Sequence, residues 1–329
     1  MPPTTPLGWE PPERIEEYRI IRLLGAGGMG RVYLGEDTVL QRQVAVKFLQ
    51  PLHPDDDARA RFLNEARAVA RLQHQSVVSI YRVGEVQGHP YLVSEFVKGR
   101  TLDLVDLPLA WEQVLTIALA LARGLAAAHG SNVLHRDIKP ANIILGEDGA
   151  AKLLDFGLAQ LGGEGHPEPG AAQPLVGTPL YLAPELWLGE APSPRSDIYA
   201  LGAVLFELAT GAAPHQGLTV DEVRAATLRR DVPSLVQCVT WVDARFAAVV
   251  DRCLAREPAR RYASARELEQ ALAALTTSAA APRPRRRLPL AVAGLLLATA
   301  PLVLLLLRAR TTARTSTARP RLVMVQPGS

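Results

Sequence analysis

The sequence predicts an α+β fold in which short strands come first and apolar helices follow. Apolar runs of strand length dominate the segment from Tyr18 to Val97. Longer apolar segments follow, and residues 111–129 have the length and pattern of a helix. Near the C-terminus, Leu288–Leu307 is a stretch of 20 residues without a charge. A chain of 329 residues also has room for about two domains.

Composition narrows the classes of protein to which the chain can belong. A hydrophobic content of 48% is enough for a sizeable core, and a net charge of +3 gives no reason to expect a nucleic-acid partner. Cys238 and Cys253 form neither a metal-binding spacing nor a disulfide framework, which is typical of a reducing compartment. Only 4 of the 36 basic residues are Lys, so we expect Lys47 and Lys139 to serve chemistry that needs a compact ammonium group.

The N-terminal part contains a glycine-rich turn between two strand-like runs. Residues 1–17 are Pro-rich and polar, so we expect a flexible tail there and no secretory signal peptide. The runs Tyr18–Leu24 and Arg31–Leu34 flank the turn Gly25–Gly30. A G-x-G-x-x-G pattern also marks dinucleotide sites, but a helix follows it there, whereas a strand-like run follows it here. The glycines therefore predict a hairpin whose backbone can approach a phosphate group closely.

Four further elements are predicted before the central motif. Gln43–Leu49 has the pattern of a strand, and Tyr91–Val97 has that of a buried strand. Between them, Ala58–Leu72 has the apolar spacing of a helix, with Glu65 near its middle. The long apolar helix Trp111–His129 is expected to be core scaffold without a chemical role.

The central motif is the run HRDIKPAN, which begins at His135. It brings a carboxylate (Asp137), a cation (Lys139) and an amide (Asn142) within six residues of one another. A second carboxylate, Asp155, follows at the end of an apolar run and precedes Phe-Gly. Phosphoryl transfer needs a positioned hydroxyl, neutralised phosphate oxygens and bound Mg²⁺, and these side chains are suited to that chemistry.

These motifs, in this order, resemble those of eukaryotic-like protein kinases, and most of all bacterial receptor-type (Hanks-type) Ser/Thr kinases. The resemblance covers residues 18–275, and Lys139 stands where Ser/Thr-type kinases have a Lys. It implies a bilobal kinase fold, with a small antiparallel β-sheet lobe containing one main helix over residues 18–96. The larger, mostly helical lobe spans residues 97–275. It also implies transfer of the γ-phosphoryl group of ATP to protein Ser/Thr hydroxyls, including autophosphorylation.

The resemblance implies a role for each site residue. The expected catalytic residues are the proton-accepting Asp137, the phosphate-neutralising Lys139 and Lys47, and Glu65, the ion-pair partner of Lys47. Asn142 and Asp155 are expected to hold Mg²⁺, or Mn²⁺ in its place. A larger set of residues is expected to contact ATP, and it includes the glycine-rich hairpin and the hinge, which is the end of the run Tyr91–Val97. Its members are Leu24, Gly25, Ala26, Gly27, Gly28, Met29, Gly30, Val32, Ala45, Lys47, Glu95, Val97 and Ile144.

Other residues are expected to support the site. Thr178–Glu185 resembles the substrate-binding segment of the family, with Thr178 bonded to the catalytic loop. Asp197 is expected to accept hydrogen bonds from the backbone of that loop, and its alternative role is a helix N-cap. Glu185 is expected to pair with Arg261, with Arg260 as the alternative.

The C-terminal part predicts a membrane anchor. Residues 276–287 form a basic linker, and the 20 residues of Leu288–Leu307, at 1.5 Å each, can cross a hydrocarbon core of about 30 Å. A buried core helix is the alternative, but the kinase-like region is complete by Leu275. Because a kinase needs cytosolic ATP, we expect a single-pass cell-membrane protein with a cytoplasmic kinase region and a short outer tail, residues 308–329.

The expected partners are protein substrates with Ser or Thr, the lipid bilayer around the span, and a second copy of the chain. Gly294 and Ala298 form a small-x-x-x-small pair that permits close contact between two such helices. Two other functions remain open at this point. A membrane-anchored pseudokinase scaffold requires a broken catalytic motif, and none is evident. A small-molecule phosphotransferase of kinase fold is disfavoured by Thr178–Glu185, which resembles a segment that binds protein substrates.

Overall fold

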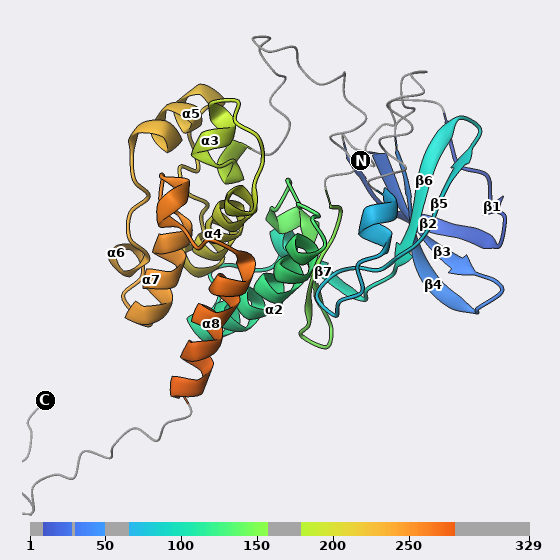
Figure 1. Ribbon diagram of the computed structural model, residues 1–329. Coiled ribbons are helices and arrows are strands. Elements are labelled where there is room, and N and C mark those ends of the chain that lie inside the picture. Colours follow the sequence, from blue (N-terminus) through green and yellow to red (C-terminus); the bar gives the residue numbers. More distant parts are fainter. Residues whose placement is uncertain (1–8, 28–29, 50–65, 157–178, 280–329) are drawn as a thin grey trace, which may run out of the picture. The chain divides into compact units, whose positions relative to one another are not determined.

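The structure is a computed structural model that describes residues 9–27, 30–49, 66–156 and 179–279 (Figure 1). By its internal contacts the chain divides into one unit over residues 1–278 and another over residues 279–329. All strands and almost all helical residues described below belong to the first unit. The predicted membrane span, 288–307, lies outside the described residues.

Six antiparallel strands form the sheet of the N-terminal lobe, in the spatial order β1-β2-β3-β4-β6-β5. Their bounds are β1 (Arg14–Ile15), β2 (Tyr18–Gly27), β3 (Gly30–Asp37), β4 (Arg42–Phe48), β5 (Ile80–Val86) and β6 (His89–Glu95). Strand β4 shows why the sheet forms, because buried Val44, Val46 and Phe48 alternate with Ala45 and Lys47. Val44, Val46 and Phe48 belong to an apolar cluster on one face of the sheet, so Lys47 is directed to the other face.

The prediction that residues 1–17 form a flexible tail is wrong for residues 9–17, which the structure describes as docked on the sheet. Strand β1 pairs with β2, with Ile15 opposite Tyr18, and the Ile15 side chain is buried. Further upstream, the Trp9 ring stacks on His89 with ring centroids 3.8 Å apart. The physical reason is that this face of the sheet is apolar, and covering it removes apolar surface from water. The predicted strands from Tyr18, Gln43 and Tyr91 correspond to β2, β4 and β6, whereas β5 was not predicted.

A second, three-stranded sheet contains β7 (Gly99–Thr101), β8 (Ile143–Gly146) and β9 (Ala151–Leu153). The backbone N–H of Leu153 donates to the Ser76 carbonyl at 2.9 Å, and the N–H of Val78 donates to the Leu153 carbonyl at 3.0 Å. These bonds join the small sheet to the chain that leads into β5. A single 3₁₀ turn, η2 (Pro140–Asn142), precedes β8, so the position of the sheet also fixes the end of the HRDIKPAN run.

Residues 66–70 of the predicted helix Ala58–Leu72 are helical. The remaining elements are helical too and build the C-terminal lobe (Figure 1). They are η1 (Leu102–Leu104), α2 (Trp111–Gly130), η4 (Pro179–Tyr181), α3 (Pro184–Trp187), α4 (Pro194–Thr210), α5 (Val220–Arg229), α6 (Leu235–Cys238), α7 (Ala244–Cys253), η5 (Pro258–Arg260) and α8 (Ala265–Ala279). Within the described ranges, α2 is the one helix that is long and apolar enough to cross a membrane, yet half of it is buried inside the fold. It is therefore the core scaffold that the sequence predicts.

Helix α4 has clear start and stop signals in its sequence. The Ser193 side chain accepts a hydrogen bond from the Ser196 N–H, and Pro194 occupies the first turn. At the other end, Gly211 adopts a left-handed conformation with φ of 89°. Because Ser193 is the cap, the alternative role of Asp197 as the N-cap is wrong.

A buried ion pair joins the predicted substrate segment to the end of the C-terminal lobe. Arg261 Nη1 and Nη2 donate to the two carboxylate oxygens of Glu185 at 2.6 and 2.8 Å. The Arg261 side chain is 0% exposed and that of Glu185 is 5% exposed. Arg260, the alternative partner, instead pairs at the surface with Glu257 at 2.9 Å. The pairing of Glu185 with Arg261 is therefore the one that the structure forms.

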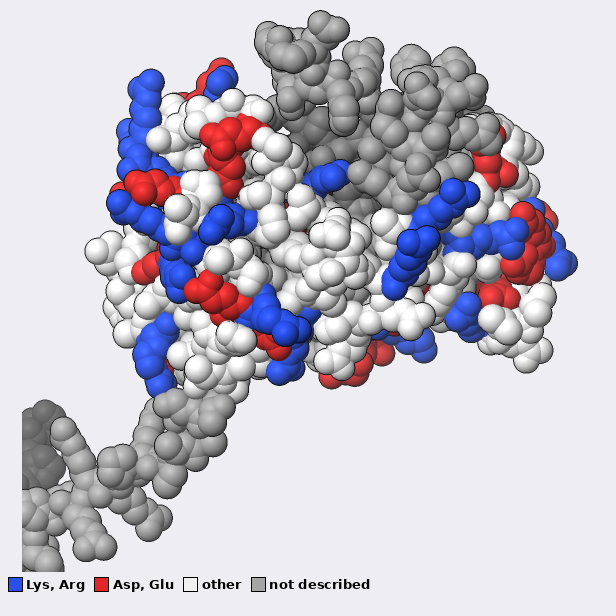
Figure 2. All heavy atoms as spheres, in the orientation of Figure 1, with Lys and Arg blue, Asp and Glu red and all other residues white. Residues whose placement is uncertain are grey.

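On the face shown in Figure 2, basic and acidic side chains alternate over the helical part of the chain. Several exposed side chains of the C-terminal lobe form ion pairs, for example Arg256 with Asp231 at 2.8 Å and Arg252 with Glu267 at 2.8 Å. Such exposed pairs contribute little to stability, with a median of about 0–1 kcal/mol. The Arg261–Glu185 pair differs from them because both its charges are removed from water.

Replacing Arg261 by Ala should lower the free energy of unfolding by about 3–5 kcal/mol, because Glu185 is left buried without a counter-charge. Chemical denaturation of the full chain, followed by tryptophan fluorescence, measures the change. Arg260→Ala is the matched control and should change stability by less than about 1 kcal/mol, since its ion pair is exposed. Equal effects of the two substitutions would contradict the structural role given to Arg261.

Candidate active site

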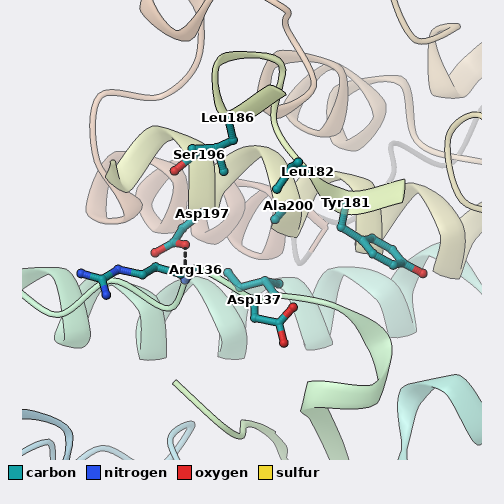
Figure 3. A pocket seen from close by; sticks show the side chains of 9 residues that line it. Arg136, Asp137, Tyr181, Leu182, Leu186, Ser196, Asp197 and Ala200 are labelled. Atoms are coloured by element: carbon teal, nitrogen blue, oxygen red, sulfur yellow. Dashed lines mark hydrogen bonds between the residues drawn. The ribbon is translucent and has the colours of Figure 1, made fainter. Parts of the chain in front are cut away.

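The HRDIKPAN run is held in place by one buried carboxylate from α4. Asp197 Oδ2 accepts hydrogen bonds from the His135 backbone N–H at 2.8 Å and from His129 Nε2 at 2.9 Å. Its Oδ1 accepts from the Arg136 backbone N–H at 2.9 Å, as Figure 3 shows. Arg136 has a φ of 64°, a left-handed conformation that is unfavourable for a residue with a side chain. The bond to Asp197 therefore stabilises a strained turn directly before Asp137.

Asp137 is oriented by two neighbours from its own loop. Asn142 Nδ2 donates to Asp137 Oδ2 and to the Asp137 carbonyl oxygen, both at 2.8 Å. Lys139 Nζ lies 2.8 Å from the same Oδ2. The Asp137 residue is only 8% exposed. In Figure 3 its carboxylate points away from Asp197, so the carboxylate that holds the loop and the one offered to a substrate are separate.

Lys47 and Asp155 meet although they come from different sheets. Lys47 Nζ, on β4, lies 2.7 Å from Asp155 Oδ2, two residues after β9. Asp155 has a φ of 48°, again in the left-handed region. The backbone N–H of Leu154 donates to the Asn142 carbonyl at 2.9 Å, which sets Asp155 beside the catalytic loop. The structure thus brings Lys47, Asp155 and Asn142 together, although the Lys47–Asp155 ion pair was not among the predicted contacts.

The side chains of Asn142 and Asp155 fit a hard divalent cation. Because the Asn142 amide nitrogen donates to Asp137, its amide oxygen is the end that can bind a metal. Mg²⁺ is commonly bound by one or two carboxylates together with substrate phosphates, rather than by a complete protein cage. Among the described residues, no group of three or more His, Cys, Asp or Glu side chains is placed to hold a metal ion.

His135 connects the two halves of the site, a role that the sequence did not reveal. It is 0% exposed, and its ring centroid lies 4.6 Å from that of Phe156. Burial lowers the pKa of His135 below its usual value, and the charges of Asp197 and Asp137 offset only part of this effect. The Asp137 backbone N–H donates to His135 Nδ1 at 3.4 Å, which a neutral ring permits. His135 therefore acts as a buried spacer between the catalytic loop and the Asp155 segment.

A hollow lies beside Asp137. Residues of the catalytic loop, the predicted substrate segment and α4 line it (Figure 3): Arg136, Asp137, Ile138, Tyr181, Leu182, Leu186, Ser196, Asp197 and Ala200. Tyr181 donates from its hydroxyl to Glu207 Oε2 at 2.7 Å. Burial raises the pKa of both the Tyr181 hydroxyl and the Glu207 carboxyl. This bond holds the segment against α4, while Thr178 lies outside the described residues.

The residues predicted to contact ATP come from five places in the structure. The end of β2 contains Leu24, Gly25, Ala26 and Gly27, and the start of β3 contains Gly30 and Val32. Strand β4 presents Ala45 and Lys47 on one face. Glu95 ends β6, Val97 follows that strand, and Ile144 lies in β8. Strands β2 and β3 form the predicted hairpin, with Gly27 opposite Gly30. Three predicted residues, Gly28, Met29 and Glu65, lie outside the described residues, so the Lys47–Glu65 ion pair stays a prediction.

One ion pair near this region was missed from the sequence. The Glu95 carboxylate at the end of β6 pairs with Lys152 Nζ on β9. The pair joins the last strand of the N-terminal lobe to the small sheet that precedes Asp155. Because the chain has only 4 Lys residues, the presence of Lys152 was itself a sign of a specific role. Its position in the sequence, however, did not indicate a partner.

Comparison with known proteins agrees with this geometry. A family model described as "Protein kinase domain" matches residues 18–273. The chain is 36% identical to a probable serine/threonine-protein kinase PknB of Lactococcus lactis over 80% of its length, and 36% identical to serine/threonine-protein kinase PrkC of Bacillus subtilis over 77%. It is 38% identical to serine/threonine-protein kinase Pkn1 of Myxococcus xanthus over 79% of its length.

The matched regions cover only 42%, 39% and 38% of those three relatives, so the chain spans about two fifths of their length. Apart from β1, the match nevertheless includes the strands of both sheets, the catalytic loop and the helices around them. The expected resemblance to bacterial Ser/Thr kinases is thereby confirmed, and the chain belongs to the protein kinase family.

Proposed function

We propose that this chain is a Ser/Thr protein kinase that transfers the γ-phosphoryl group of ATP to protein hydroxyls, its own included. The observation that carries the proposal is the set of contacts among Lys47, Asp155, Asn142 and Asp137. These contacts bring a phosphate-binding cation, two oxygen donors for a metal and a base into one site. Ser/Thr specificity is supported by the names of the relatives, which are serine/threonine-protein kinases. Lys139, which lies 2.8 Å from Asp137, also stands where Ser/Thr-type kinases have a Lys.

In this proposal Asp137 orients the substrate hydroxyl and accepts its proton. Lys139, already held at Asp137, is placed to neutralise the γ-phosphoryl oxygens, and Lys47 to bind the α- and β-phosphates. Asn142 and Asp155 would hold Mg²⁺, with Mn²⁺ as a substitute. The bound ion would supply positive charge to the phosphate oxygens as negative charge develops on them. The protein's own contribution is mainly positioning and electrostatic stabilisation.

Lys47→Met should abolish transfer while the fold is retained, because Lys47 faces the site rather than the apolar cluster behind β4. Asp137→Asn should lower kcat by at least about a hundredfold, since it removes the base. The assay uses the purified full chain in detergent with labelled Mg²⁺–ATP, and scores phosphate on the chain, on an added protein and on small alcohols.

Lys98→Met is the matched control for Lys47, because Lys98 is exposed next to the hinge. It should leave turnover unchanged. Near-wild-type turnover of Lys47→Met or Asp137→Asn would refute the assigned site. A wild-type chain that transfers phosphate to nothing would favour the pseudokinase scaffold, and transfer to small alcohols alone would favour the small-molecule phosphotransferase.

We also propose that residues 288–307 anchor the kinase domain in the cell membrane by a single span. Its support is the uncharged run of 20 residues with 10 Leu and 2 Val, which is long enough for the hydrocarbon core. The flanking Arg residues are balanced on the two sides, so the orientation is argued from the need for cytosolic ATP. Gly294 and Ala298 would form the contact face of a homodimer of spans.

Deleting residues 288–307 should move the protein from the membrane fraction to the soluble fraction without loss of intrinsic transfer activity, because the deletion removes only the apolar span. Fractionation after a carbonate wash, with immunoblotting, measures the change. Deleting residues 308–329 instead is the control and should leave the protein in the membrane. Recovery of the full chain in the soluble fraction would contradict the anchor.

A further inference from the structure

The segment at residues 9–15, called here the N-terminal strap, is fixed on the outer face of the N-terminal lobe by Trp9. The Trp9 ring stacks on His89 at an interplanar angle of 14°, and its Nε1 donates to Gln87 Oε1 at 3.0 Å. It also contacts the edge of the Phe48 ring, with centroids 5.4 Å apart. One side chain thus joins the β5–β6 turn to the end of β4.

The strap also holds the first residues of β3, which directly follow the glycine-rich turn. Arg31 Nη1 donates to the Trp9 carbonyl at 2.9 Å and to Glu10 Oε1 at 3.0 Å. Tyr33 donates from its hydroxyl to Glu10 Oε2 at 3.1 Å. The Arg31 side chain is 19% exposed, so these bonds are partly shielded from water. Trp9 and Glu10 therefore bind the strand that leads out of the hairpin.

Phe48 connects these outer contacts to the nucleotide side of the sheet. Its backbone carbonyl lies so close to Gly30 that a Cβ there would come within 1.9 Å of the oxygen, and Gly30 has a φ of +130°. The start of β3 thus lies directly against the Phe48 backbone. The Phe48 ring in turn contacts the Trp9 ring. Lys47 directly precedes Phe48 in β4, and its side chain lies on the opposite face of the sheet, toward Asp155.

Beyond this base, the described part of the hairpin is held by its own ladder, in which Gly25 pairs with Val32 and Gly27 with Gly30. Among the described residues, a Cβ placed on Gly25 or Gly27 would meet no atom within 4 Å, so side-chain packing does not fix these two positions. Ordering such a segment on binding costs conformational entropy, and restraint in the free protein reduces that cost. A clamp at the base of the hairpin is therefore a means of increasing nucleotide affinity.

We propose that the N-terminal strap positions the glycine-rich hairpin and strand β4 for the nucleotide, with Trp9 as the positioning residue. The inference rests on the proposed kinase function and assigns a part in it to residues upstream of the matched kinase domain. Trp9 acts through Phe48 and Arg31, which lie between it and the nucleotide side. Its loss should therefore weaken nucleotide binding more than it slows the transfer step.

The test compares Trp9→Ala, Trp9→Phe and Trp241→Ala in the full chain. Calorimetric titration with Mg²⁺ and a non-hydrolysable ATP analogue gives Kd, steady-state kinetics give KM for ATP and kcat, and thermal melting gives Tm. Trp9→Ala should raise Kd and KM about five- to tenfold with kcat within about twofold, the pattern of lost ground-state binding. Trp9→Phe keeps an aromatic ring on His89 and Phe48 and should stay within about twofold of the wild type.

Trp241 lies in the C-terminal lobe and is 49% exposed, so Trp241→Ala should change none of the three quantities. If Trp9→Ala fails to fold, Glu10→Gln takes its place, since Glu10 is 68% exposed and its substitution removes the charge beside Arg31. It should raise Kd about two- to threefold, as one weakened restraint would. A lowered Tm with unchanged Kd, in whichever variant folds, would overturn the strap proposal alone. A wild-type chain that binds no nucleotide would overturn the proposed function and the strap together.

Discussion

The carboxylate of Asp197 is the constraint on which the catalytic loop depends. It is 2% exposed, and it is satisfied by two successive backbone N–H groups, those of His135 and Arg136, and by the His129 ring. A buried charge is tolerable only when it is fully hydrogen-bonded. Loop and helix therefore stabilise each other. The N–H groups of the loop donate hydrogen bonds to the carboxylate, and the carboxylate keeps Arg136 in a left-handed conformation. Asp137 follows directly, so its direction is determined by a helix to which it does not belong.

The other side chains of the site are positioned by different elements, each with its own support. Lys47 is presented by β4, whose opposite face is covered by an apolar cluster and by Trp9. Asp155 is placed by the small sheet and by the Leu154–Asn142 backbone bond. The predicted substrate segment is held by the buried Arg261–Glu185 pair. Rigid elements thus determine the geometry, which suits a reaction in which positioning and electrostatics do most of the work.

Motif residues and strongly periodic elements were predictable from the sequence, whereas contacts between distant segments were not. The pattern of β4 and the long apolar run of α2 specify their elements locally, because burial repeats with the period of each structure. The polar, Pro-rich start of the chain indicated a tail, and only the partners of Trp9, about eighty residues away at Gln87 and His89, show that it docks. The choice of Arg261 over Arg260 likewise depends on which side chain points inward.

The most direct test of this account is the kinetic effect of Asp197→Asn, which replaces one hydrogen-bond-accepting oxygen by a donor. The amide oxygen replaces only one of the two oxygens that accept from the His135 and Arg136 backbone N–H groups, so the loop should shift while the nucleotide contacts made by the N-terminal lobe are preserved. We expect kcat to fall about a hundredfold, the scale of a small misplacement of a catalytic group, with Kd for an ATP analogue within about twofold. Asp221→Asn, at an exposed site in α5, should change neither quantity. A kcat of Asp197→Asn close to the wild-type value would contradict the account.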